Sequence, residues 1–150
     1  VQEVLRRQSE IGKMKKYYLA AVSPPPLPEN GVIDAPILRD YDSIIKRKIA
    51  AEGARAVTHY KIVATGSDYA IVEFLLETGR THQIRLHCSY AGFPIIGDTL
   101  YGNEETFTKA PHQLLHAYKT ELVHPITGET QVFIAPPPRE WGRYAPHTLP

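Results

Sequence analysis

Residues 80–102 bring together most of the side chains in this chain that could do chemistry. The stretch reads RTHQIRLHCSYAGFPIIGDTLYG, and its candidate groups are Arg80, His82, Arg85, His87, Cys88 and Asp98. Such residues serve in three kinds of site: histidine and cysteine bind zinc, a cysteine thiolate acts as a nucleophile, and arginine binds carboxylates or phosphates. The spacing of the residues and their context decide among these three.

The two histidines of this stretch are spaced wrongly for a shared metal ion. Zinc ligands on one helix lie three or four residues apart, whereas His82 and His87 are five residues apart, or about 140° around a helix axis. The other histidines are too scattered along the chain to complete a site. We therefore expect no metal.

Cys88 has the context of a core residue rather than of a nucleophile. In a helix over residues 81–92 it shares the more apolar face with Ile84, His87 and Ala91. No G-x-S-x-G elbow or equivalent turn surrounds it. We expect a buried, unreactive thiol.

Arg85 lies on the other face of that helix, with His82, Leu86 and Tyr90. A guanidinium on a half-apolar face needs a carboxylate or phosphate partner. The alternatives are a salt bridge to a neighbouring acidic side chain and a functional contact in a pocket. The segment GDTLYG (97–102) is typical of a turn in which Asp98 bonds to backbone N–H groups.

The elements that must position these residues indicate one α+β domain with a predominantly antiparallel sheet and a few flanking helices. Hydrophobic spacing predicts a helix over 2–10 ended by Gly12, and a helix over 81–92 capped by Thr81 and stopped by Gly92. The predicted strands cover 16–22, 32–38 at a sheet edge, 55–66 and 70–77 as a hairpin, 112–124, and 130–135. The predicted irregular segments are 23–31, 136–150, and 40–54 as an exposed loop or weak helix.

The bulk composition is that of an ordinary globular domain. The net charge is +1, so any basic surface must come from local clustering. The single cysteine excludes an internal disulfide and suits a reducing compartment, from which we expect a cytoplasmic protein. No apolar run approaches the ~18 residues of a membrane span.

Residues 77–102 closely resemble the signature of the RluA branch of the pseudouridine synthases, T-G-R-x-H-Q-[IL]-R-x-H followed by G-x-P-[IL]-x-G-D-x-x-Y-G. KKYYLAAV (15–22) resembles the family's K-x-Y-x-A-x-V strand, with Tyr18 at the tyrosine position. LLHAYKTELVHPITGE (114–129) and FIAPPP (133–138) resemble two further family segments. The resemblance extends over about residues 4–140.

The resemblance implies an enzyme that isomerises uridine to pseudouridine in ribosomal or transfer RNA, without metal or cofactor. The target base leaves its stack, an aspartate carboxylate does the covalent work, and the base is reattached to its sugar through carbon. Carried over by position, Arg85 pairs with that carboxylate and Leu86 lines the pocket beside it. Tyr18 matches the tyrosine that packs against the flipped base and takes part in proton transfer.

Basic side chains near these motifs are the expected RNA contacts. Arg80 and His82 match motif positions, and Arg80 suits a phosphate. For His82 and His87 the alternative is hydrogen bonding to backbone groups around the helix. The other candidates, whose alternative is ordinary solvated surface, are Lys13, Lys15, Lys16, Lys46, Arg47, Lys48 and Arg55.

One motif of the family is missing. The catalytic aspartate belongs to H-R-L-D-x-x-T-S-G, well upstream of the K-x-Y strand, yet only seventeen residues precede Tyr18 and Val1 opens the chain within a predicted helix. We therefore expect the C-terminal half of a catalytic domain, separated from its N-terminal half and inactive by itself. Its exposed apolar sheet edge would favour self-association. The alternatives are a non-catalytic RNA-binding protein with the same fold and, with little support from the spacing, an unrelated hydrolase or metal protein.

Overall fold

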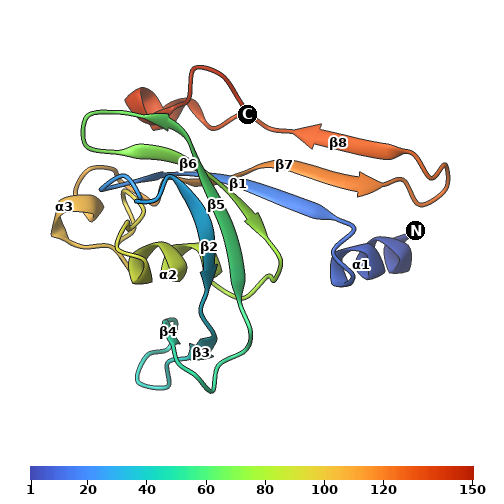
Figure 1. Cartoon of the computed structure of the whole chain (residues 1–150), viewed down its shortest axis with the longest axis horizontal. Coiled ribbons are helices and arrows are strands. Elements are labelled where there is room, and N and C mark those ends of the chain that lie inside the picture. The colour runs from blue at the N-terminus through green and yellow to red at the C-terminus, as the bar shows by residue number, and fades with distance from the viewer.

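The computed structural model describes all 150 residues and shows an α+β fold (Figure 1). The strands are Lys15–Val22 (β1), Asn30–Asp34 (β2), Ile37–Arg39 (β3), Arg47–Ile49 (β4), Val57–Thr65 (β5), Ala70–Leu76 (β6), Leu115–Val123 (β7) and Thr130–Ile134 (β8). The helices are Gln2–Glu10 (α1), Gln83–Tyr90 (α2), Glu104–Phe107 (α3) and the 3₁₀ segment Arg139–Tyr144 (η1). The predicted fold class is confirmed.

Six strands form one antiparallel sheet in the order β2-β5-β6-β1-β7-β8. β1 lies near its centre, where Tyr18 is opposite Phe74 of β6 on one side and Ala117 of β7 on the other. The predicted hairpin over 55–77 is β5–β6, and β7–β8 forms a second hairpin. Figure 1 shows α1 at the far end of β1 and β7, away from α2.

Alternation along β1 sends its side chains to two separate cores. The core beneath α2 contains Ala20, Val22, Phe74, Ile84 and Cys88, with Tyr18 at its margin. The core on the other face contains Leu19, Ala21, Ile71, Tyr118 and, from η1, Trp141 and Tyr144. Because both faces of β1 are covered here, residues 19–22 have no exposed surface. A three-layer arrangement therefore fixes the strand that carries Tyr18.

The segment from 32 to 54 differs from its prediction. The expected single strand breaks at Pro36 into β2, which is an edge strand of the main sheet, and β3, which pairs with β4 in a separate hairpin. No helix forms over 40–54. Ile37 and Ile49 are paired across β3–β4, and they pack with Leu86 of α2. The conformation of β3 and β4 thus depends on packing against α2, which cannot be predicted from the propensities of the local sequence.

The start of α2 also differs from its prediction, because Thr81 does not cap it. His82 occupies the cap position in the left-handed region, with φ 58° and ψ 20°. The Gln83 side chain instead organises the turn: its Oε1 accepts from Arg80 N at 3.0 Å, and its Nε2 donates to Val57 O at 3.1 Å. Gly92, with φ +87°, follows the end of the helix as expected.

The outer strand β8 leaves an apolar edge exposed. Val132, Phe133 and Ile134 are 52%, 59% and 57% exposed, and no strand pairs with the free side of β8. An exposed apolar edge was expected, but self-association through that edge stays a prediction.

None of the helices is long and apolar enough to cross a membrane.

Candidate active site

An open cavity of about 390 Å³ lies where the N-terminal end of α2 meets β1, β6 and the start of β7. Its lining residues are Tyr18, Leu76, Arg80, His82, Gln83, Ile84, Arg85, Gln113 and Leu115. A neighbouring depression shares Tyr18, Leu76 and Arg80 with it and adds Lys16. The structure therefore brings Tyr18, predicted from the strand motif at 15–22, together with Arg80, His82 and Arg85, predicted from the motif at 77–102.

Arg85 is held by a two-pronged ion pair with Asp98. Arg85 Nε donates to Asp98 Oδ2 at 2.8 Å, and Nη2 donates to Oδ1 at 2.7 Å. Asp98 Oδ1 also accepts from the backbone N–H groups of Leu100 and Tyr101 at 2.9 and 3.0 Å. The turn predicted for 97–102 is confirmed, and its aspartate is the partner that a largely buried arginine requires.

Burial and charge act on this pair in opposite directions. The Asp98 side chain is only 1% exposed, and that of Arg85 is 14% exposed. Burial by itself would raise the pKa of Asp98, but the hydrogen bonds from Arg85 and from two backbone N–H groups outweigh it and lower that pKa. The carboxylate raises the pKa of Arg85 in turn. Both side chains are charged near neutral pH.

The partner of Arg85 within this chain differs from the one that the resemblance implied. Arg85 was expected to pair with a carboxylate from an upstream motif, yet Asp98 already engages two of its three nitrogens. Nη1 makes no hydrogen bond within the protein. Nη1, with both of its hydrogens free, is the main donor that Arg85 still has for a further group in the cavity, and Nη2 keeps one more hydrogen.

Tyr18 occupies the margin between the core and the cavity. Its ring packs beside the cluster beneath α2, and burial raises the pKa of its phenol. The hydroxyl makes no hydrogen bond within the protein, although the side chain lines both depressions. A neutral phenol with a free hydroxyl can therefore face a ligand from this wall.

Leu86 does not line the cavity, which corrects the expectation for it. Consecutive residues on a helix point about 100° apart, so Leu86 turns away from the side that Arg85 presents. It packs with Ile37 and Ala56 and is 8% exposed. The apolar wall is instead made by three residues that the sequence reasoning missed, Leu76, Ile84 and Leu115.

The two histidines of α2 have different environments. His87 is fully buried, with Nε2 bonded to Ala35 O at 2.9 Å and Nδ1 to Thr58 Oγ1 at 2.8 Å. The expectation of a structural role with a backbone partner is confirmed for His87. His82 has no backbone partner: its Nδ1 lies 2.9 Å from the hydroxyl of Tyr101.

Cys88 is fully buried in the core beneath α2, as expected, and burial raises the pKa of its thiol well above the usual range. Ala91 does not share that environment, since it is exposed.

No group of three or more His, Cys, Asp or Glu side chains in the structure could hold a metal ion.

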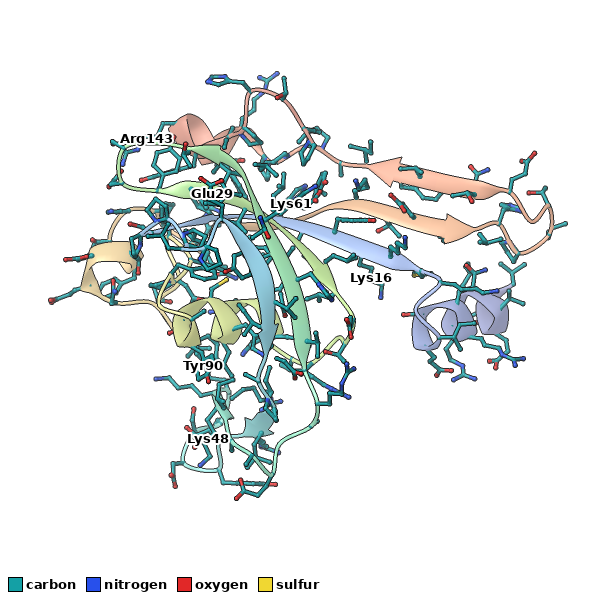
Figure 2. All side chains as sticks on the ribbon, in the orientation of Figure 1. Lys16, Glu29, Lys48, Lys61, Tyr90 and Arg143 are labelled. Atoms are coloured by element: carbon teal, nitrogen blue, oxygen red, sulfur yellow. The ribbon has the colours of Figure 1, made fainter.

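The predicted basic residues form two groups rather than one patch. Lys15 and Lys16 begin β1, and Lys16 lines the depression beside the cavity together with Arg80, whose Nε donates to Arg55 O at 3.0 Å. Lys46, Arg47 and Lys48 lie on the β3–β4 hairpin. Figure 2 shows Lys16 beside β1 and Lys48 apart from it, at the lower end of the molecule on the β3–β4 hairpin.

One member of the second group is connected to the cavity. The backbone N–H of Arg47 donates to the Tyr101 hydroxyl at 2.8 Å, and that hydroxyl contacts His82. Lys48 is partly engaged elsewhere, 3.7 Å from Asp40. The β3–β4 hairpin is therefore tied to the cavity wall by a backbone hydrogen bond, whereas β1 contributes the Lys16 side chain beside the cavity.

Comparison with known proteins identifies the family of this chain. The model of the family described as RNA pseudouridylate synthase matches residues 2–90. An uncharacterized RNA pseudouridine synthase of Chloroflexus aurantiacus is 44% identical over 133 residues, which are 89% of this chain and 42% of that protein. The dual-specificity RNA pseudouridine synthase RluA of Escherichia coli is 38% identical over 134 residues, 88% of this chain and 61% of that protein.

Solved structures show the same fold. Human RNA pseudouridylate synthase domain containing 1 superposes with a TM-score of 0.77 at 25% identity, over 96% of this chain and 64% of that one. Domain containing 4 gives a TM-score of 0.75 at 23% identity, over 95% of this chain and 66% of that one. The chain spans about half the length of the curated relatives it matches. It belongs to the RNA pseudouridylate synthase family.

Proposed function

We propose that this chain forms the uridine-binding part of an enzyme that converts uridine to pseudouridine in ribosomal or transfer RNA. The observation that carries the proposal is the convergence of Tyr18 and Arg85 in one cavity, from motifs far apart in the sequence. Both residues present a hydrogen-bonding atom that has no partner within the protein. We place the protein in the cytoplasm.

The cavity suits a base that has left its stack. Leu76, Ile84 and Leu115 offer apolar surface for a ring, and the Tyr18 phenol and Arg85 Nη1 offer polar contacts. A flipped nucleotide is read in this way, by apolar or aromatic contacts to its faces and by hydrogen bonds at its edge. Phosphates on either side of the flipped nucleotide would meet Arg80 and the flanking lysines.

The reaction needs a carboxylate that the cavity does not contain. No Asp or Glu is among its lining residues, and Glu77, beside the neighbouring depression, is bound to Arg55 at 2.9 Å and to His59 at 2.6 Å. We propose that an aspartate from a segment outside these 150 residues approaches Arg85 Nη1 and Tyr18. The bond from the sugar to N1 of uracil breaks, a bond to C5 forms, and the proton on C5 is lost while N1 gains one.

The absence of a carboxylate from the cavity also supports a second candidate, a protein that binds uridine-containing RNA without modifying it. Two assays on ribosomal and transfer RNA separate the candidates. The 150-residue chain is expected to form no pseudouridine, whereas the same chain extended upstream through an H-R-L-D-x-x-T-S-G segment is expected to form it. Pseudouridine from the short chain would refute the need for an added carboxylate. RNA binding without product from the extended protein would favour the second candidate.

A further inference from the structure

His82 holds a backbone conformation that its residue type rarely adopts. It is the only non-glycine residue of the chain with positive φ. The left-handed region is disfavoured for residues with a Cβ, and such residues collect at sites where the surrounding structure enforces the geometry. The Gln83 side chain organises the turn in which His82 lies, and the Tyr101 ring lies edge-on to the His82 imidazole at 5.6 Å between centroids.

The hydrogen bonds around Tyr101 determine which imidazole nitrogen carries the hydrogen. The Tyr101 oxygen accepts the backbone N–H of Arg47 at 2.8 Å. Its own hydrogen is therefore free, and His82 Nδ1 at 2.9 Å is the acceptor within reach. If Nδ1 accepts this hydrogen, the neutral ring must carry its own hydrogen on Nε2.

Nε2 is the nitrogen that remains open. It makes no hydrogen bond within the protein. Every side-chain nitrogen or oxygen that is buried in the structure has a hydrogen-bond partner, so the unpartnered Nε2 must be in contact with solvent. His82 also lines the cavity that Tyr18 and Arg85 share. An N–H donor of fixed direction is thus placed at that cavity.

Burial and the neighbouring cations both favour the neutral form of the His82 ring. Burial, followed by Arg85 from α2 and Arg47 from β4, lowers the pKa of His82. Asp98 opposes these effects, but its carboxylate is bound to Arg85. The Tyr101 hydroxyl and Arg80, on the cavity wall, add no negative charge near neutral pH. Nε2 of the neutral His82 ring is therefore available as a donor near neutral pH.

We propose that Tyr101 sets the tautomer of His82, so that Nε2–H donates to an acceptor oxygen of the bound nucleotide. The assignment rests on the proposed function, since it takes a uridine nucleotide as the ligand. The acceptor belongs either to the uracil ring, as a carbonyl oxygen, or to the adjoining phosphate. The role of Tyr101 is positioning, because it acts on the ligand through His82.

The tautomer can be read without any ligand. Long-range ¹H–¹⁵N correlation spectra of the 150-residue chain at pH 7.5 should show His82 with hydrogen on Nε2 and none on Nδ1. In Tyr101→Phe the Nδ1–H form should appear, because the donor to Nδ1 is gone. An Nδ1–H tautomer in the unsubstituted protein would overturn the assignment, and so would an unchanged tautomer in Tyr101→Phe.

Adding uridine or uridine 5′-monophosphate to the same sample identifies the acceptor. A shift of the His82 Nε2–H signal with both probes assigns it to the ring, and a shift with the monophosphate alone assigns it to phosphate. Shifts of Arg85 and Tyr18 without any change at His82 would overturn this inference and leave the proposed function standing. No shift at any of the three would count against both.

Two substitutions test the donor in RNA binding. His82→Asn suits the left-handed backbone, because asparagine tolerates that region, but it cannot place a donor as far out as Nε2. His82→Gln can. With a short uridine-containing RNA, His82→Asn should weaken binding about tenfold, the usual effect of losing one hydrogen bond, and His82→Gln should recover most of the loss. Equal affinities for the two variants would contradict a distal donor.

Discussion

Arg85 and Asp98 form a nearly buried ion pair that joins the helix of the candidate active site to the turn that follows it. Their two hydrogen bonds, at 2.8 and 2.7 Å, fix the plane of the guanidinium and leave Nη1 as its free end. Asp98 also binds two backbone N–H groups of its own turn. One carboxylate therefore determines both the shape of the turn and the direction in which Arg85 reaches the cavity.

Removing the charge of Asp98 should destabilise the domain strongly. Asp98→Asn keeps an acceptor for the turn but leaves Arg85 as a buried, unpaired cation, and breaking a buried pair in this way costs about 3 kcal/mol. The matched control is Asp68→Asn, since Asp68 binds Lys109 at 2.9 Å but is 48% exposed; this change should cost less than about 1 kcal/mol. Urea unfolding at pH 7 measures both, and equal losses would show that burial of the pair is unimportant.

The same pair predicts how stability depends on pH. The pKa of Asp98 is lowered in the folded state, so its contribution is complete above the unfolded value of about 3.9 and is lost as the pH falls through the folded value. The stability gap between the unsubstituted protein and Asp98→Asn should therefore shrink as the pH is lowered below about 4. Thermal unfolding of both proteins from pH 7 down to pH 3 measures the gap, and a constant gap would argue against a titrating Asp98.

Two leucines should separate binding from stability. Leu86→Ala removes a core side chain and should cost about 2–4 kcal/mol of unfolding free energy, while RNA affinity of the folded protein stays near its original value. Leu115→Ala removes part of the cavity wall and should weaken affinity for uridine-containing RNA with a smaller loss of stability. Filter binding measures the RNA affinity of both variants, and urea unfolding measures their unfolding free energy. A loss of RNA affinity in Leu86→Ala but not in Leu115→Ala would show that Leu86 lines the pocket.

RNA binding should depend on salt through the basic residues beside the cavity. The logarithm of RNA affinity falls linearly with the logarithm of the salt concentration. For single-stranded RNA, each lysine that neutralises a phosphate adds about 0.7 to the steepness of this fall. Lys16→Gln should therefore reduce both the affinity and this steepness, because Lys16 lines the depression beside the cavity. Lys61→Gln is the control, because Lys61 binds Glu73 on the opposite face of the sheet. An affinity that does not change with salt would remove Lys16 from the interface.

The exposed edge at β8 should make the isolated chain self-associate. Val132, Phe133 and Ile134 carry no charge, and unprotected edge strands pair with other chains. Phe133→Lys should shift the protein toward the monomer in sedimentation velocity. Ile126→Lys adds the same charge at a residue that is 79% exposed in the β7–β8 turn and should change little. A monomer at all concentrations without substitution would contradict the prediction.

Local pattern in the sequence was enough for most of the regular structure. Runs rich in aromatic and β-branched residues, bounded by turn residues, located β1, β6, β7 and β8, and alternation located β5. Gly92 identified the end of α2, since a glycine with positive φ terminates helices. The pattern was insufficient at residues 40–54, where β4 forms only because Ile49 meets Ile37 and the neighbouring Leu86.

The sequence by itself determined the family, the α+β class and the residue types of the site, Tyr18, Arg80, His82 and Arg85. Only the tertiary structure decided how these groups are used. It paired Arg85 with Asp98, turned Leu86 away from the cavity, supplied Leu76 and Leu115 for the wall, and bound His82 to Tyr101. The reason is physical: hydrophobic periodicity is a property of neighbours along the chain, whereas ion pairs and cavity walls are made by residues that meet only after the sheet has formed.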